Sequence, residues 1–264
     1  MYWNLLSALG GVGLFLLGMI LLTDGLKAVA GPRLRSMLAR FTSTPLSGAV
    51  TGALTTAAIQ SSSATTVAAV GFVASGLLTF PQAIGIIFGA NIGTTMTGWL
   101  VALLGFKLDL GQITLPLVFV GALLTLSGKK SVSFVGQALA GFSLIFIGIE
   151  HMKLGLEAFE GIVTPADFPS DSLWGRLGLV AIGVLITLIT QSSSAGVATA
   201  LAALSAGAVN FSQAGALVIG MDVGTTFTAA LATLGGGTMA KRTGFAHVIY
   251  NIMTGYHYKP PYGM

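Results

Sequence analysis

The feature that most limits the fold is an internal repeat. The pentapeptide QSSSA occurs at residues 60–64 and again at residues 191–195, so equivalent positions follow the relation 191 − 60 = 131. The blocks GANIGTT at residues 89–95 and GMDVGTT at residues 220–226 keep the same separation without a gap. Polar residues that recur at a fixed distance in apolar surroundings predict one structural unit that the chain contains twice.

The repeat divides the chain into two expected domains, residues 1–130 and residues 131–264. The apolar pattern of the first predicts helices at residues 5–30, 81–104 and 111–127, with a polar-interrupted segment at residues 46–78. The second predicts helices at residues 132–154, 212–234 and from about residue 240 onward, with an interrupted segment at residues 173–209. The last helix holds only about 15 apolar-rich residues, fewer than a membrane span needs, so we expect it to be truncated.

The composition places both domains in a membrane. The chain is 54% hydrophobic and 8% charged, with a mean hydropathy of +0.89, whereas soluble domains carry about 25% charged residues. We therefore predict an all-α integral membrane protein surrounded by a lipid bilayer. Its positive residues fall in short loops, where they set orientation, so the net charge of +4 does not indicate a nucleic-acid partner. The chain has no cysteine, which excludes disulfides and thiolate metal sites.

The two interrupted segments are too long for single membrane spans. Each exceeds the length of about 20 residues that one span needs, so each is either a long kinked helix or a re-entrant hairpin. Hairpins place these positive residues on one side of the membrane: Arg33, Arg35, Arg40, Lys129, Lys130, Lys241 and Arg242. They place a more acidic set on the other side: Lys107, Asp109, Glu157, Glu160, Asp167, Asp171 and Arg176. This distribution favours hairpins and predicts that the N-terminus lies outside.

Hairpins also determine how the two halves are related. Each half then crosses the membrane three times, so the second half is inserted in the opposite orientation to the first. Inverted repeats with broken helices are typical of secondary transporters, whose substrate site lies near the middle of the membrane. We therefore expect a multi-pass protein of the plasma membrane, which in a bacterium is the inner membrane.

The QSSS runs have the chemistry of an anion site. Serine favours helix starts, so each run is expected to mark the N-terminus of a half-helix, with free N–H groups and hydroxyls that can donate to an oxyanion. The glutamine, hydroxyl and carbonyl oxygens also suit a small cation such as Na⁺. The alternative is that the serines only join neighbouring helices, which the doubled motif disfavours. Further oxygen ligands are expected from Asn91, Thr94, Thr95, Asp222, Thr225 and Thr226, although these threonines could instead bond to their own helix backbone.

Three other groups of polar residues are weaker candidates. Asp24 and Lys27 are three residues apart, which indicates a local pair at the membrane interface. Glu150 and His151 fall near the outer end of their helix, where solvated residues are common. His247 shares a helix face with an asparagine four residues later, and that pair alone is weak support for a metal site.

With both motifs in place, the sequence resembles the type II sodium–phosphate cotransporter family over about residues 5–251. The resemblance implies a phosphate site at Gln60, Ser61, Ser62, Ser63, Gln191, Ser192, Ser193 and Ser194. It implies sodium ligands among Gln60, Ser63, Asn91, Thr94, Thr95, Gln191, Ser194, Asp222, Thr225 and Thr226. Asp222 departs from the asparagine usual in the family, which suggests a Na⁺ ligand or altered coupling. Bacterial members often continue into a soluble PhoU-like domain, which we do not expect here, and a homodimer partner could complete the last helix.

The function that the resemblance implies is import of inorganic phosphate driven by the Na⁺ gradient, with no cofactor and no metal beyond Na⁺ as the coupling ion. The alternative within transport is another small oxyanion or solute, coupled to Na⁺ or H⁺. An intramembrane serine hydrolase is disfavoured, because neither QSSS run has a nearby histidine or a G-x-S-x-G turn. We therefore do not expect an enzyme, and a twofold repeat suits a channel poorly.

Overall fold

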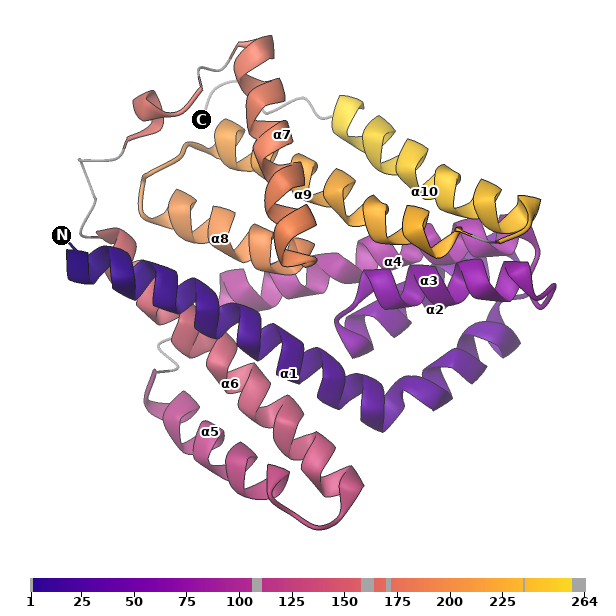
Figure 1. Ribbon diagram of the computed structural model, residues 1–264, viewed down its shortest axis with the longest axis horizontal. Coiled ribbons are helices and arrows are strands. Elements are labelled where there is room, and N and C mark those ends of the chain that lie inside the picture. The colour runs from indigo at the N-terminus through magenta and orange to yellow at the C-terminus, as the bar shows by residue number, and fades with distance from the viewer. Residues whose placement is uncertain (1, 106–110, 158–163, 170–171, 235, 258–264) are drawn as a thin grey trace.

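All described residues of the computed structural model form helices and their connections, with no strand among them (Figure 1). The described residues are 2–105, 111–157, 164–169, 172–234 and 236–257. The first half contains α1 (Tyr2–Phe41), α2 (Pro45–Ile59), α3 (Ser62–Ala74), α4 (Phe80–Leu100), the π-helical turn η1 (Val101–Gly105) and α5 (Gly111–Thr125). The second contains α6 (Lys130–Glu157), the 3₁₀ turn η2 (Pro165–Asp167), α7 (Leu173–Thr190), α8 (Ser193–Ser205), α9 (Phe211–Ala232) and α10 (Thr238–His257).

Helix lengths and hydropathy confirm the membrane character of the chain. Within the described ranges, five helical stretches are long and apolar enough to cross a membrane: Tyr2–Gly31, Phe80–Gly105, Lys130–Gly155, Leu173–Thr190 and Phe211–Ala232. The helices α5 and α10, which the sequence predicts as crossings, do not belong to this set. The first has 15 residues, and the second contains Lys241, Arg242, His247 and Asn251.

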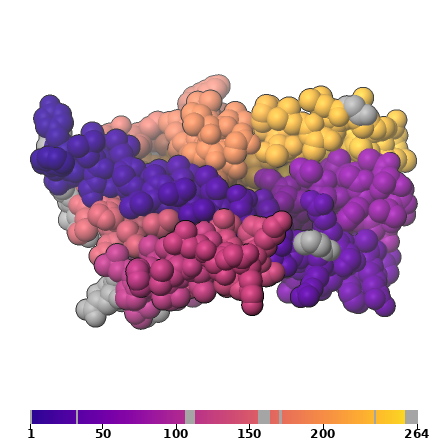
Figure 2. Space-filling model, turned by 60° about the horizontal axis from the view of Figure 1, so that its bottom comes forward, coloured from indigo at the N-terminus to yellow at the C-terminus, as the bar shows by residue number. Residues whose placement is uncertain are grey.

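The long helices α1 and α6 pack closely along their lengths, and glycine makes this possible. Both carry a glycine at every seventh position: Gly11, Gly18 and Gly25 on α1, and Gly141, Gly148 and Gly155 on α6. A Cβ atom at Gly18 would lie 2.7 Å from the carbonyl oxygen of Gly141, and one at Gly148 would lie 2.6 Å from that of Gly11. The helices therefore run antiparallel in backbone contact along this glycine seam. In Figure 2, α1 lies directly beside the surface formed by α5 and α6.

Close glycine contacts also hold the broken segments against their neighbouring helices. A Cβ at Gly89 of α4 would collide with the backbone of Ala49 in α2, and one at Gly220 of α9 would collide with the backbone of Val180 in α7. Gly89 and Gly220 occupy equivalent positions of the repeat. The helix pairs α2–α4 and α7–α9 are thus packed in the same way.

Repeat-related glutamines anchor the start of α4 and of α9. Gln82 donates through Nε2 to the carbonyl oxygen of Thr42 (2.7 Å), and Gln213 donates to that of Pro165 (2.8 Å). Each also accepts from the backbone N–H of the residue that caps its own helix, Thr79 for α4 and Asn210 for α9. The glutamines therefore tie each helix start to the chain that leads into the preceding hairpin segment.

Part of the predicted charge pattern lies outside the described residues. This applies to Lys107, Asp109, Glu160 and Asp171 on the predicted outer side. The observed α1 is longer than the predicted helix 5–30 and reaches Phe41, with a bend along its length (Figure 1). Its last part carries the cluster of arginines that the sequence assigns to a loop.

Candidate functional site

The two polar runs break their helices with the same backbone conformation. Gln60 ends α2 and Gln191 ends α7, and both have a φ of 53° in the left-handed region. They are the non-glycine residues with positive φ among the described part of the chain. Each glutamine donates through Nε2 to a carbonyl three residues earlier, at 2.6 Å for Gln60 and 2.7 Å for Gln191. Left-handed conformation is costly for a residue with a Cβ, and its occurrence at equivalent positions shows that the two helix breaks are built in the same way.

Serine starts the next helix in each run. The side chains of Ser61 and Ser192 accept from the backbone N–H of Ala64 (3.3 Å) and Ala195 (3.2 Å). Both serines have extended backbones and cap α3 and α8. The first N–H groups of each half-helix have no partner within the helix, and the helix dipole makes this end positive.

The structure brings both runs to one cavity of about 300 Å³, which we call the QSSS cavity. All eight residues of the predicted phosphate site line it: Gln60, Ser61, Ser62, Ser63, Gln191, Ser192, Ser193 and Ser194. The rest of the lining comes from α1, Thr190 and Thr225. Two half-helix starts from opposite halves of the sequence therefore converge on the same space.

Threonines on α4 and α9 fix the orientation of the two glutamines. Thr97 donates to Oε1 of Gln60 at 2.6 Å, and Thr228 donates to Oε1 of Gln191 at 3.1 Å. The two threonines are again equivalent positions of the repeat. The hydroxyl oxygens of Ser194 and Thr97 lie 3.5 Å apart. Thr97 therefore contacts both Gln60 in the first half of the chain and Ser194 in the second.

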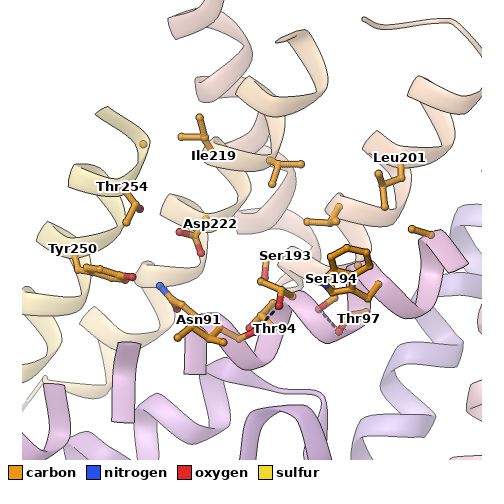
Figure 3. Close-up of a pocket in the computed structure, with 18 residues that line it drawn as sticks. Asn91, Thr94, Thr97, Ser193, Ser194, Leu201, Ile219, Asp222, Tyr250 and Thr254 are labelled. Carbon is orange, nitrogen blue, oxygen red and sulfur yellow. Dashed lines mark hydrogen bonds between the residues drawn. The ribbon is translucent and has the colours of Figure 1, made fainter. Parts of the chain in front are cut away.

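A second cavity lies on the far side of the α8 start, where α4, α8, α9 and α10 meet (Figure 3). It has a volume of about 690 Å³, and we call it the α10 cavity. Asn91, Thr94, Thr95 and Asp222 line it rather than the QSSS cavity. Ser193 and Ser194 line both, so the first turn of α8 separates the two spaces.

The threonines of the two blocks bond to their own helices. Thr94 donates to the carbonyl of Ala90, Thr95 to Ile92, Thr225 to Met221 and Thr226 to Val223, at distances of 2.7 to 3.0 Å. This arrangement fits the alternative that their hydroxyls satisfy the helix backbone. Of the four, Thr225 also lines the QSSS cavity, and Thr226 is buried outside both cavities.

An asparagine of α10 connects the two repeat-related blocks. The Oδ1 atom of Asn251 accepts from Asn91 at 2.6 Å, and its Nδ2 atom donates to the backbone carbonyl of Asp222 at 2.9 Å. Asn251 is 1% exposed, and its amide lies 3.4 Å from Nε2 of His247, which is also buried. His247 and Asn251 therefore share one face of α10, as the sequence predicts. The other polar groups that Asn251 contacts are the side-chain amide of Asn91 and the backbone carbonyl of Asp222. No group of three or more potential His, Cys, Asp or Glu metal ligands occurs within the described ranges.

Comparison with known proteins identifies the family of the chain. The profile of the Na⁺/Pi-cotransporter family matches residues 14–154 and 173–257, which include both QSSS runs and the helices that surround the two cavities. The chain belongs to the Na⁺/Pi-cotransporter family. It is accordingly a multi-pass membrane protein of a transporter family.

Relatives of the chain are named for different kinds of phosphate transport. The chain is 32% identical over 242 residues to YqeW of Bacillus subtilis, covering 90% of this chain and 76% of that protein. It is 30% identical over 257 residues to YjbB of Escherichia coli (strain K12), a candidate inorganic phosphate export protein by name, covering 95% of this chain and 45% of YjbB. It is 39% identical over 103 residues to human sodium-dependent phosphate transport protein 2B, covering 38% and 15% of the two chains. The chain thus spans less than half the length of YjbB, and no solved structure matches it.

Sequence reasoning missed two charged residues of the QSSS cavity. Asp24 and Lys27 line it from α1, beside both serine runs, although the sequence indicates only a local pair at the interface. Both lie within the candidate span Tyr2–Gly31, where charged residues are rare and usually functional. Their position inside a span is the signal that could have marked them.

The left-handed glutamines give a test of the hairpin geometry. Gln60→Gly is expected to be more stable than Gln60→Ala by about 1 kcal/mol, because glycine adopts positive φ without a Cβ penalty. At Ala57, inside α2, the order must reverse, so that glycine is less stable than the native alanine by about 1 kcal/mol. Thermal unfolding of the purified variants in one detergent measures both differences. Equal stability of the two Gln60 variants would contradict the left-handed conformation.

Proposed function

We propose that this protein is a secondary transporter that moves inorganic phosphate across the membrane by coupling it to Na⁺. The single observation that carries the proposal is the convergence of both QSSS runs on one cavity. Family membership supports the substrate class, since the relatives named above include a sodium-dependent phosphate transporter. Import as the direction of transport, and its coupling to the Na⁺ gradient, are part of the proposal.

The chemistry of the QSSS cavity suits a tetrahedral oxyanion. Two helix N-termini each supply free N–H groups and roughly half a positive charge from the helix dipole. Six serine hydroxyls add donors that can rotate toward a bound anion. The backbone N–H groups of the helix starts are held in place before the ligand arrives and need no rearrangement on binding, which favours affinity.

Sodium would be held by the oxygen-rich surroundings of the same cavity. The glutamine Oε1 atoms, the serine hydroxyls and Thr225 are hard ligands of the kind that Na⁺ accepts. Asn91, Thr94, Thr95 and Asp222 lie across the first turn of α8, so they would act on ions in the α10 cavity. We therefore propose that Asp222 binds a cation in the α10 cavity, next to Ser193 and Ser194, which line both cavities.

Inverted topology is supported by the contact between α1 and α6. These helices occupy equivalent places in the two halves and run antiparallel along the glycine seam. Two equivalent helices that point in opposite directions are what oppositely inserted repeats produce. We propose that α2–α3 and α7–α8 are re-entrant hairpins, that residues 1–130 and 131–264 are the repeats, and that the N-terminus lies outside in a bacterial inner membrane.

Transport into proteoliposomes tests the function. We expect uptake of labelled phosphate to be saturable and at least tenfold faster with an inward Na⁺ gradient than with an equal K⁺ gradient. An H⁺ gradient, and competition by sulfate, arsenate or dicarboxylates, distinguish other couplings and solutes. The reverse arrangement, phosphate-loaded vesicles with an outward Na⁺ gradient, tests the export that the name of YjbB suggests. Equal uptake in Na⁺ and K⁺ would reject the coupling.

A further inference from the structure

Lys27 of α1 lies where two cavities meet. It lines the QSSS cavity together with both serine runs, and it lines a third cavity of about 430 Å³ between α1, α2 and α3. The charged and hydroxyl-bearing residues of this third cavity, which we call the α1 cavity, are Lys27, Arg35, Thr55 and Thr65. The α1 cavity therefore reaches the serine site from behind the first turn of α3.

The charges that line the α1 cavity favour an anion. In the α1 cavity the charged residues are Lys27 and Arg35, both positive. Residues eight apart on a helix lie near one face, so the two charges follow α1 along the cavity. In the QSSS cavity the charged residues are Lys27 and Asp24, one turn apart on α1. The charged side chains of the α1 cavity are thus both positive, and Lys27 continues into the QSSS cavity, where Asp24 accompanies it.

Lys27 belongs to a helical stretch that is long and apolar enough to cross a membrane. The residue falls within the candidate span Tyr2–Gly31 and is half-buried even without lipid. Charged residues at membrane depth face protein or water-filled cavities and mark the paths of ions and substrates. A lysine ammonium is a compact charge on a flexible stem, which suits contact with a phosphate oxygen.

On the basis of the phosphate transport proposed above, we propose that Lys27 binds the anion in the QSSS cavity through its positive charge. We further assign the α1 cavity as the route by which the anion reaches Lys27 past Arg35. Two helix N-termini contribute about half a positive charge each, and Lys27 adds a full one, which together balance a phosphate dianion. The carboxylate of Asp24 then adds about one uncompensated negative charge to the occupied site, and one coupling Na⁺ neutralises it.

Removal of the Lys27 charge tests the first part in proteoliposomes. Lys27→Gln is expected to raise the half-saturating concentration of inorganic phosphate roughly 10- to 100-fold, the loss of one charge-assisted contact. Lys27→Arg keeps the charge and is expected to retain most of the affinity. Arg33→Gln is the matched control, because it removes the same charge from an exposed position on the same helix. Unchanged affinity in Lys27→Gln, or equal losses with Gln and Arg, would overturn the role of the charge.

The route past Arg35 is tested by measuring phosphate uptake at different ionic strengths. Arg35 is exposed, so its replacement does not disturb packing. Arg35→Gln is expected to slow phosphate uptake roughly threefold at low salt and to have no effect at high salt, because screening removes long-range attraction. Arg33→Gln serves again as the control. If the two arginine variants behave alike at every salt concentration, the α1 cavity is not the route.

The two proposals fail in different ways. A wild-type protein that takes up no phosphate in either direction rejects the transport function itself. A wild-type protein that transports phosphate, together with Lys27→Gln and Arg35→Gln variants that match it, rejects only the assignment of Lys27 and the α1 cavity.

Discussion

Phosphate uptake is expected to fall roughly 10- to 100-fold when Ser194 is replaced by alanine, because a buried hydroxyl that donates to a charged ligand contributes about 1.5–3 kcal/mol. Ser194 is 8% exposed, lines both the QSSS cavity and the α10 cavity, and lies 3.5 Å from Thr97 of the other half. Its loss removes a donor from the proposed anion site and from the contact that joins the two halves. Initial uptake rates at saturating Na⁺ measure the effect.

Ser143→Ala is the matched control for this variant. Ser143 is fully buried in α6, and its hydroxyl bonds to the carbonyl of Leu139 in the same helix, away from both cavities. The same substitution there is expected to leave uptake within about twofold of the wild type, because back-bonding within a helix contributes little. Equal losses at Ser194 and Ser143 would mean that general packing, rather than ligand binding, explains the effect.

A large loss of stability is expected from Gly18→Ala at the glycine seam. A Cβ there would lie 2.7 Å from the carbonyl oxygen of Gly141 and from the backbone nitrogen of Ile145, so α1 and α6 must separate. Forced separation of close-packed helices costs about 3 kcal/mol, which corresponds to a fall of roughly 6–12 °C in the melting temperature for a chain of this size. Thermal unfolding in detergent provides the measurement.

Gly13→Ala supplies the comparison within the same helix. A Cβ at Gly13 would have no neighbour within 4 Å, and alanine is the better helix former by about 1 kcal/mol. We therefore expect Gly13→Ala to be as stable as the wild type or more so. If both glycine variants melt at the same temperature, the seam does not hold the two halves together.

The sequence is sufficient to predict the helical membrane class, the breaks at the QSSS runs and the serine starts of α3 and α8. These features depend on local chemistry: hydropathy, helix capping and a repeat with constant spacing. The paired motifs also indicate the family that the profile comparison confirms. Helix ends are harder to predict, because α1 continues through its arginine cluster to Phe41.

The division of the polar residues between two cavities could not be predicted from spacing. Asn91 and Asp222 occupy the same motif position in each repeat, yet Asn251 of α10 bonds to the side chain of one and the backbone of the other. That contact depends on how α10 packs against α9, α3 and α4, which is a tertiary property. The location of Lys27 is also a tertiary property, since the fold places it beside serines that lie far along the chain.

The glycine seam also has a symmetry of its own. When α1 is aligned with α6, Gly11 corresponds to Gly141 and Gly18 to Gly148, so the contact of Gly11 with Gly148 maps onto that of Gly18 with Gly141. A surface that contacts its own equivalent in this way is isologous, the type of interface found in twofold-symmetric homodimers. The two halves of this single chain therefore meet along the seam as two subunits of such a dimer meet.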